Sequence, residues 1–242
     1  MAQCCLTGFK WDGERAGTDG KLSNNNTYIT GSNKDVAILM IHDIFGWTFP
    51  NLRLLADHFA EEIGATVFNG DVVSEDTIMD PQKRESFDFQ AFFKPHSKES
   101  RYPEIAACAR ALKEEHKFKK VGAMGYCWGG WGVFQLGAKG ENLVDAISTA
   151  HPSWLTKEEV NVVSVPVQII APEQDPQLTP ELKEHLNATI PKLGLEYDYQ
   201  YFPGARHGLA ARCDRENAGE RRAMERAKNA AVTWFAQMLH RD

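Results

Sequence analysis

Cys127 lies between glycines in the segment Gly125-Tyr126-Cys127-Trp128-Gly129, which follows a predicted strand and precedes a predicted helix. Gly-x-Cys-x-Gly in a strand-turn-helix context is typical of a nucleophile elbow. Larger side chains two residues before and after the nucleophile would collide with the adjoining strand and helix. The helix N-terminus favours a thiolate. The pattern predicts a nucleophilic Cys127, and the alternative is a buried structural thiol in a tight turn.

An acid and a histidine follow Cys127 in the order that such an elbow requires. Asp175 follows a predicted strand over residues 165–171, and His207 follows another over residues 197–202. His207 is predicted to deprotonate the thiol or pair with it, while Asp175 fixes the histidine tautomer and stabilises the imidazolium. Glu173 is an alternative acid, because it also lies past the predicted strand end.

His151 follows the strand after the elbow helix, and we expect it to line the pocket. A role as the base is the alternative, although a histidine that precedes the acid has the wrong order. Solvated or half-buried positions in or beside helices are expected for the other histidines considered, His58, His116, His185 and His240.

Two backbone N–H groups near Cys127 are predicted to form an oxyanion hole. One belongs to Trp128, and the other to Ile44, in the loop after the buried apolar strand over residues 36–41. Asp43 in the same loop brings a carboxylate toward the thiol. A negative charge there raises the pKa of a thiol, so Asp43 would hold the resting thiol neutral.

Alternating strands and helices are predicted to position these residues. Strands are expected at residues 28–31, 36–41, 66–68, 119–124, 144–149, 165–171 and 197–202, and helices at 51–63, 103–112, 129–138, 180–190 and 216–239. Helices of ten to fifteen residues between strands indicate parallel crossovers and hence a doubly wound α/β sheet. Ligands bind such a sheet beyond the carboxyl ends of its strands.

The chain of 242 residues, 43% of them hydrophobic, is expected to form a single domain over residues 1–242. Folds of this class often run to about 200–250 residues as one unit. Residues 1–26 are predicted as a leader segment. Residues 72–102, which contain four phenylalanines and no clean period, are predicted as a lid or pocket wall.

Composition excludes several classes of function. A net charge of −6 argues against nucleic acid as a partner. The longest apolar run has six residues, too few to cross a membrane. Five cysteines, an odd number without a Cys-x-x-Cys pair, indicate free thiols in a reducing, cytoplasmic setting, with neither a disulfide framework nor a zinc site. No metal and no cofactor are expected. A monomer or homodimer is expected.

The elbow, Asp43-Ile44-Phe45-Gly46, Asp175 and Arg206-His207-Gly208 together resemble the dienelactone hydrolase family, a branch of the α/β-hydrolases. The resemblance covers residues 25–242 and implies the α/β-hydrolase fold with Cys127, Asp175 and His207 as a catalytic triad. The leader segment is similar to that of fungal-type members.

Two features of the family bear on substrate binding. Bacterial members carry glutamate at the position of Asp43, where it holds the thiol until the substrate carboxylate displaces it. Aspartate is one methylene shorter. Arginines bind that carboxylate, and the matching residues are Arg84 and Arg212, for which a surface position is the alternative.

Thiolate chemistry restricts the substrate independently. Because a thiolate leaves a tetrahedral intermediate more easily than an alkoxide, enol lactones, aryl esters and thioesters should react better than alkyl esters. Trp47, Trp128 and Trp154 indicate a compact apolar pocket for a small ring. We therefore predict a hydrolase of a small lactone or activated ester. The alternatives are a thioesterase, a silent relative that binds a metabolite, and a redox-sensing thiol protein.

Overall fold

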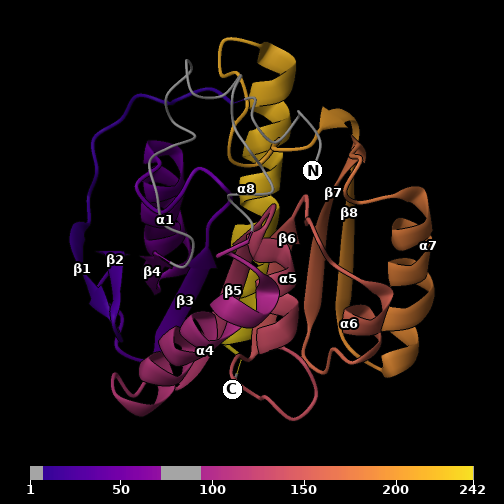
Figure 1. Cartoon of the computed structure of the whole chain (residues 1–242). Helices are drawn as coiled ribbons and strands as arrows, with labels where there is room; N and C mark the ends of the chain where they lie inside the picture. Colours follow the sequence, from indigo (N-terminus) through magenta and orange to yellow (C-terminus); the bar gives the residue numbers. More distant parts are fainter. Residues whose placement is uncertain (1–7, 72–93, 242) are drawn as a thin grey trace.

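The computed structural model describes residues 8–71 and 94–241. Its eight-stranded sheet has the order β1-β2-β4-β3-β5-β6-β7-β8 (Figure 1). The strands are β1 (Thr18–Leu22), β2 (Asn25–Thr30), β3 (Val36–Ile41), β4 (Thr66–Gly70), β5 (Lys120–Tyr126), β6 (Ala146–Ala150), β7 (Val167–Gln174) and β8 (Tyr197–Arg206). Strands β3 to β8 run parallel, whereas β1 and β2 pair antiparallel at one side. The predicted α/β class is confirmed.

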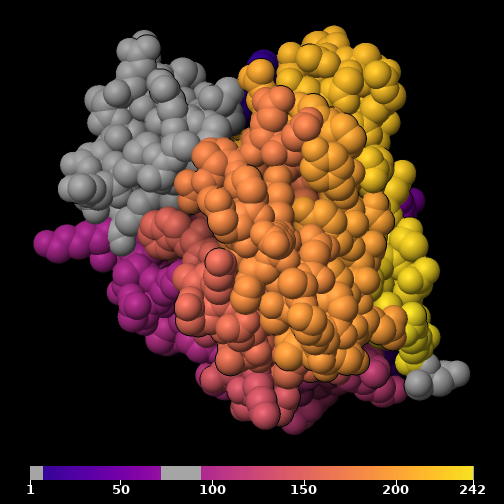
Figure 2. All heavy atoms as spheres, turned by 90° about the vertical axis from the view of Figure 1, so that its right-hand side faces the viewer, coloured from indigo at the N-terminus to yellow at the C-terminus, as the bar shows by residue number. Residues whose placement is uncertain are grey.

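Helices cover both faces of the sheet. They are α1 (Pro50–Ile63), α4 (Lys98–Glu114), α5 (Gly129–Leu136), α6 (Lys157–Asn161), α7 (Pro180–Thr189) and α8 (Ala218–Leu239), with a 3₁₀ turn, η3 (Ile190–Leu193), after α7. Helices α1 and α8 pack together on one face, and α4 and α5 pack together on the other (Figure 1). Figure 2 looks onto the β8 edge, where residues of α7, β8 and α8 form much of the surface.

The apolar run Val36–Ile41 forms β3 in the middle of the sheet, and all its residues are buried. A strand covered by helices on both faces needs such a continuous apolar sequence. Helix α1 begins with Pro50 and ends at Gly64, whose φ of 71° is left-handed. Proline is favoured in the first turn of a helix and glycine at its end, which explains these boundaries. The predicted helix over residues 51–63 therefore differs from α1 by one residue.

Residues 8–26, the described part of the predicted leader, pack against the rest of the domain. They include β1, a strand that was not predicted, and Trp11, whose buried indole donates a hydrogen bond to Cys213 O at 3.0 Å. The buried amide of Asn51 accepts from Trp11 N–H and donates to the carbonyls of Phe9 and Ala211. Asn51 thereby joins this segment to both α1 and the loop over residues 208–213.

The predicted boundaries of α4 and β7 were wrong, and one helix was not predicted. Helix α4 begins at Lys98, not after Pro103, because Ser97 caps it by accepting a hydrogen bond from Ser100 N–H. Helix α6 was not predicted, although Thr156 and Glu159 form a capping box at its start. Strand β7 extends through Glu173, which was expected to lie past its end. Of the predicted lid, residues 72–93 lie outside the described part of the chain.

None of the helices within the described ranges is long and apolar enough to cross a membrane.

Candidate active site

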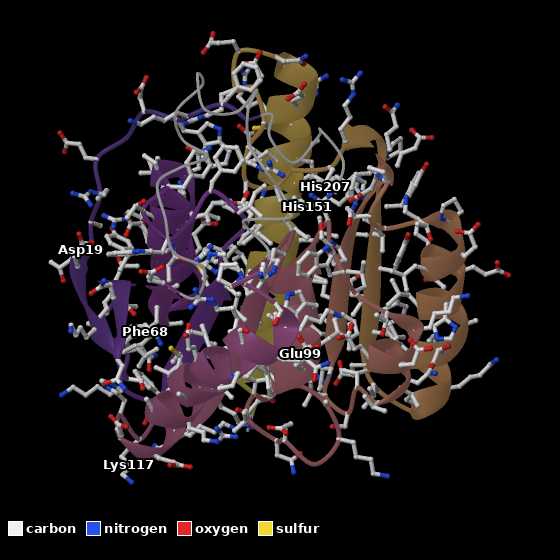
Figure 3. All side chains as sticks on the ribbon, viewed as in Figure 1. Asp19, Phe68, Glu99, Lys117, His151 and His207 are labelled. Carbon is white, nitrogen blue, oxygen red and sulfur yellow. The ribbon has the colours of Figure 1, made fainter. Side chains whose placement is uncertain are left out.

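Four candidate residues occupy equivalent places in the sheet. Cys127, His151, Asp175 and His207 are the first residues after β5, β6, β7 and β8, respectively. Because these strands are parallel neighbours, their carboxyl ends lie at one edge. Figure 3 shows His151 and His207 side by side at this edge.

The turn between β5 and α5 has the geometry of a nucleophile elbow. Cys127 has φ of 51°, a left-handed conformation that is costly for a residue with a side chain. A Cβ atom on Gly125 would lie 2.4 Å from Gly129 O, and one on Gly129 would lie 2.2 Å from Ile41 O. Both glycines are therefore required by the close approach of backbone atoms.

Cys127, His207 and Asp175 form a connected chain of buried side chains. Sγ of Cys127 lies 3.1 Å from Nε2 of His207, and Nδ1 of His207 lies 2.8 Å from Oδ2 of Asp175. The other oxygen of Asp175 accepts hydrogen bonds from the N–H groups of Gln177 and Leu178, which fix the carboxylate. The structure thus brings together the three residues predicted as a triad.

Glu173 lies away from this chain. Its side chain is exposed, and its Oε2 accepts a hydrogen bond from Gly204 N–H at 2.6 Å. The geometry therefore favours Asp175 over Glu173 as the partner of His207.

The charges of the three groups stabilise one another. Burial opposes protonation of His207, but the Cys127 thiolate and the hydrogen bond to Asp175 raise the pKa of His207 to about 10. Burial also opposes ionisation of Asp175, yet the hydrogen bond and charge of His207 lower the pKa of that carboxyl. This arrangement favours an imidazolium at His207 next to an ionised Asp175.

The predicted oxyanion donors, Ile44 and Trp128, are both buried. Within residues 8–71 and 94–241, neither backbone N–H donates a hydrogen bond, whereas the neighbouring Phe45 and Gly130 N–H groups do. Both N–H groups thus lack an acceptor among the described residues, which is what the predicted oxyanion hole requires.

Asp43 forms a buried ion pair with Arg212. Oδ2 of Asp43 lies 2.9 Å from Nε of Arg212, and the guanidinium also packs 4.9 Å from the centre of the Phe45 ring. Burial and, to a smaller extent, the charge of Cys127 raise the pKa of Asp43 to about 6, against the lowering effect of Arg212. Arg212 is thus a buried partner of the carboxylate beside the thiol, and its alternative placement on the surface is wrong.

The remaining candidates have separate environments. His151 is buried, its ring centre lies 4.9 Å from that of His207, and burial lowers its pKa to about 4, which leaves it neutral near pH 7. Trp47 is half-buried, and its ring packs against the Arg53 guanidinium at 4.7 Å. Arg84 lies outside the described residues. No cluster of metal-binding side chains occurs in the described part of the chain.

Ser153 was not predicted. Ser153 lies in the loop after β6, and its buried hydroxyl oxygen is 3.3 Å from Sγ of Cys127. The sequence does place Ser153 in the loop after β6. Because β6 is the parallel neighbour of β5, the loops that follow these two strands must meet, and this could have indicated Ser153.

Comparison with known proteins identifies the family. The dienelactone hydrolase family matches residues 26–239. The chain belongs to this family. Dienelactone hydrolase from Anabaena variabilis has the same fold, with a TM-score of 0.66 at 14% identity over 94% of this chain and 99% of that one.

Two curated relatives match almost end to end. The hydrolase tropI of Talaromyces stipitatus is 31% identical, over 98% of this chain and 96% of its own length. The carboxymethylenebutenolidase homolog of Homo sapiens is 26% identical, over 97% of this chain and 96% of its own length. The predicted family is confirmed, and the protein is a hydrolase of ester or lactone bonds.

The Asp43–Arg212 pair is expected to be a large local contribution to stability. Replacing Arg212 with methionine should lower the free energy of unfolding by about 3–5 kcal/mol, because it leaves a buried carboxylate without its cation. The pKa of Asp43 is raised in the folded state, so this loss should grow as the pH rises through about 6. Urea denaturation at pH 5 and pH 8 measures both effects.

The matched control is the double variant Asp43→Asn/Arg212→Met. Without the carboxylate it should regain much of the lost stability and its pH dependence should flatten. Equal losses in the single and double variants would show that packing of Arg212, rather than its charge, stabilises the site.

Proposed function

We propose that the protein hydrolyses small lactones or activated esters through a thioacyl intermediate on Cys127. The observation that carries this proposal is the buried chain in which the Cys127 sulfur lies 3.1 Å from His207 and His207 lies 2.8 Å from Asp175. The names of relatives, such as the carboxymethylenebutenolidase homologs and dienlactone hydrolase 1 of Gibberella moniliformis, support the same bond type.

Acylation begins when the Cys127 thiolate attacks the substrate carbonyl carbon. The carbonyl oxygen becomes an oxyanion, which the N–H groups of Ile44 and Trp128 stabilise. The intermediate collapses by breaking the bond to the leaving oxygen, and the His207 imidazolium gives that oxygen its proton. In a lactone the leaving group remains part of the same molecule.

Deacylation uses water and the same groups. Neutral His207 takes a proton from a water molecule while the water oxygen attacks the thioester carbonyl carbon. The N–H groups of Ile44 and Trp128 stabilise the second oxyanion as they did the first. Its collapse releases the acid and the Cys127 thiolate, while His207 remains protonated. Asp175 holds His207 in one orientation throughout and stabilises its positive charge.

The leaving group decides which substrates react. A thiolate is a good leaving group, so an intermediate made from an alkyl ester returns to substrate more readily than it proceeds. Enol lactones, aryl esters and thioesters release stabilised anions and are the proposed substrate class. Arg212 is a candidate for binding a substrate carboxylate, which would then replace Asp43 as the partner of its guanidinium.

Intact-mass spectrometry after mixing with an aryl ester tests the proposal. We expect the mass of the protein to increase transiently by the mass of the acyl group, and peptide mapping should place this group on the peptide that contains Cys127. A panel of aryl esters, enol lactones and thioesters that shows neither turnover nor this adduct would contradict it. Binding without turnover would instead indicate a relative that has lost its activity.

A further inference from the structure

The turn over residues 151–154, which follows β6, is strained at two places. His151 has φ of 42° and Trp154 has φ of 62°, both left-handed although neither is glycine. A left-handed conformation at such a residue costs free energy, and it is kept only where the surrounding structure imposes it. Two of them within four residues indicate that the turn is held in place from several sides.

Contacts at both ends hold the turn. His151 N–H donates to Ile170 O on β7 at 3.0 Å, and Lys98 Nζ donates to Trp154 O at 2.6 Å. Pro152 packs closely on the elbow helix, where a Cβ atom at Gly130 would lie 2.5 Å from Cβ of Pro152. These contacts leave the turn little freedom to move away from the elbow.

Ser153, at the third position of the turn, contacts Cys127 twice. Its backbone N–H donates to Cys127 O at 2.7 Å, and its hydroxyl oxygen lies 3.3 Å from Sγ. The side chain is fully buried, and among the described residues the sulfur is the hydrogen-bond partner of this hydroxyl. Because buried hydroxyl groups need a hydrogen-bond partner, the Cys127 sulfur fulfils this need for the Ser153 hydroxyl.

We propose that Ser153 is a positioning residue whose hydroxyl donates a hydrogen bond to the Cys127 thiolate. The sulfur is then held between Ser153 and His207, and its ionised form is favoured because a hydrogen bond to a charged acceptor is stronger than one to a neutral thiol. The inference deepens the proposed function, because it assigns a residue that prepares the nucleophile for attack.

Other ionisable groups also act on the sulfur and must stay constant in a test. Among the described residues, the titratable or charged side chains around Cys127 are Asp43, Tyr126, His151, Asp175, His207 and Arg212. Ser153→Ala changes none of them and keeps the N–H bond to Cys127 O. A change in the ionisation of Cys127 in this variant therefore reports the hydroxyl.

The test measures the rate of Cys127 alkylation by iodoacetamide against pH, by mass spectrometry of the peptide that carries it. Ser153→Ala is expected to raise the midpoint of this profile by about 1 and to slow alkylation about tenfold below the midpoint. The ratio kcat/KM for an aryl ester should fall by a similar factor. Ser153→Thr, which retains a hydroxyl, should restore the profile.

Ser148→Ala is the matched control. Ser148 is a fully buried serine on β6 whose hydroxyl donates to Gln168 at 2.7 Å, so its loss should leave the alkylation profile unchanged. An unchanged midpoint in Ser153→Ala, or an equal shift in Ser148→Ala, would overturn the inference. Alkylation requires no turnover, so a shifted profile without an acyl adduct would uphold it while contradicting the proposed function.

Discussion

Replacing Cys127 with alanine is expected to reduce kcat for an aryl ester or enol lactone by at least about 10⁴-fold. The variant keeps the buried site and the N–H groups of Ile44 and Trp128, but no atom remains to form the thioester. Because alanine is smaller than cysteine and suits the same buried place, the fold should persist. Steady-state turnover and the loss of the acyl adduct measure the effect.

Cys108→Ala and Cys213→Ala are the matched controls. Both thiols are free and buried, and burial raises their pKa values to about 11 and about 12, so neither is prepared for nucleophilic attack. Both variants should keep turnover within about threefold of the unmodified chain. Comparable losses in all three variants would place the effect in the fold, and full activity in Cys127→Ala would exclude the thioacyl route.

Replacing Asp175 with asparagine is expected to lower kcat by about 10³–10⁴-fold. Asparagine preserves the shape but replaces a charged acceptor of the His207 Nδ1–H with a neutral amide, so His207 loses both its orientation and the stabilisation of its positive charge. The negative charge of Asp175 contributes to the raised pKa of His207, about 10. Its removal should therefore move the alkaline limb of the pH–rate profile to lower pH.

Glu173→Gln separates this role from a general loss of charge. Glu173 is exposed, lies near the same strand end and bonds Gly204 N–H, so its neutralisation should change kcat by less than about threefold and leave the alkaline limb in place. A larger effect in Glu173→Gln than in Asp175→Asn would reverse the assignment of the acid.

The central features of the fold and site could be predicted because they depend on local patterns. The glycines around Cys127 are required because a side chain at either position would collide with nearby backbone atoms, and this pattern lies within five residues. Strand β3 is likewise recognisable as a continuous apolar run. Once alternating strands and helices indicate a parallel sheet, residues after successive strands must meet at one edge. The order of the strands therefore predicts that Asp175 and His207 lie close to Cys127.

Features that depend on distant contacts could not be predicted. Strand β1 has the sequence Thr-Asp-Gly-Lys-Leu, of which only Leu22 is buried, so it lacks the apolar alternation of a strand. It forms because β2 offers a partner. Arg212 has no local signal that distinguishes a surface arginine from the buried partner of Asp43, and Ser153 resembles any serine in a turn.

The contacts of residues 8–11 imply an order of assembly during synthesis. Trp11 and Asn51 leave the ribosome early, whereas their partners Cys213 and Ala211 are among the last parts of the chain to emerge. The same delay applies to His207 and its bond to the sulfur of Cys127. On the nascent chain Cys127 therefore lacks its His207 partner until the segment that carries His207 has folded against the finished sheet.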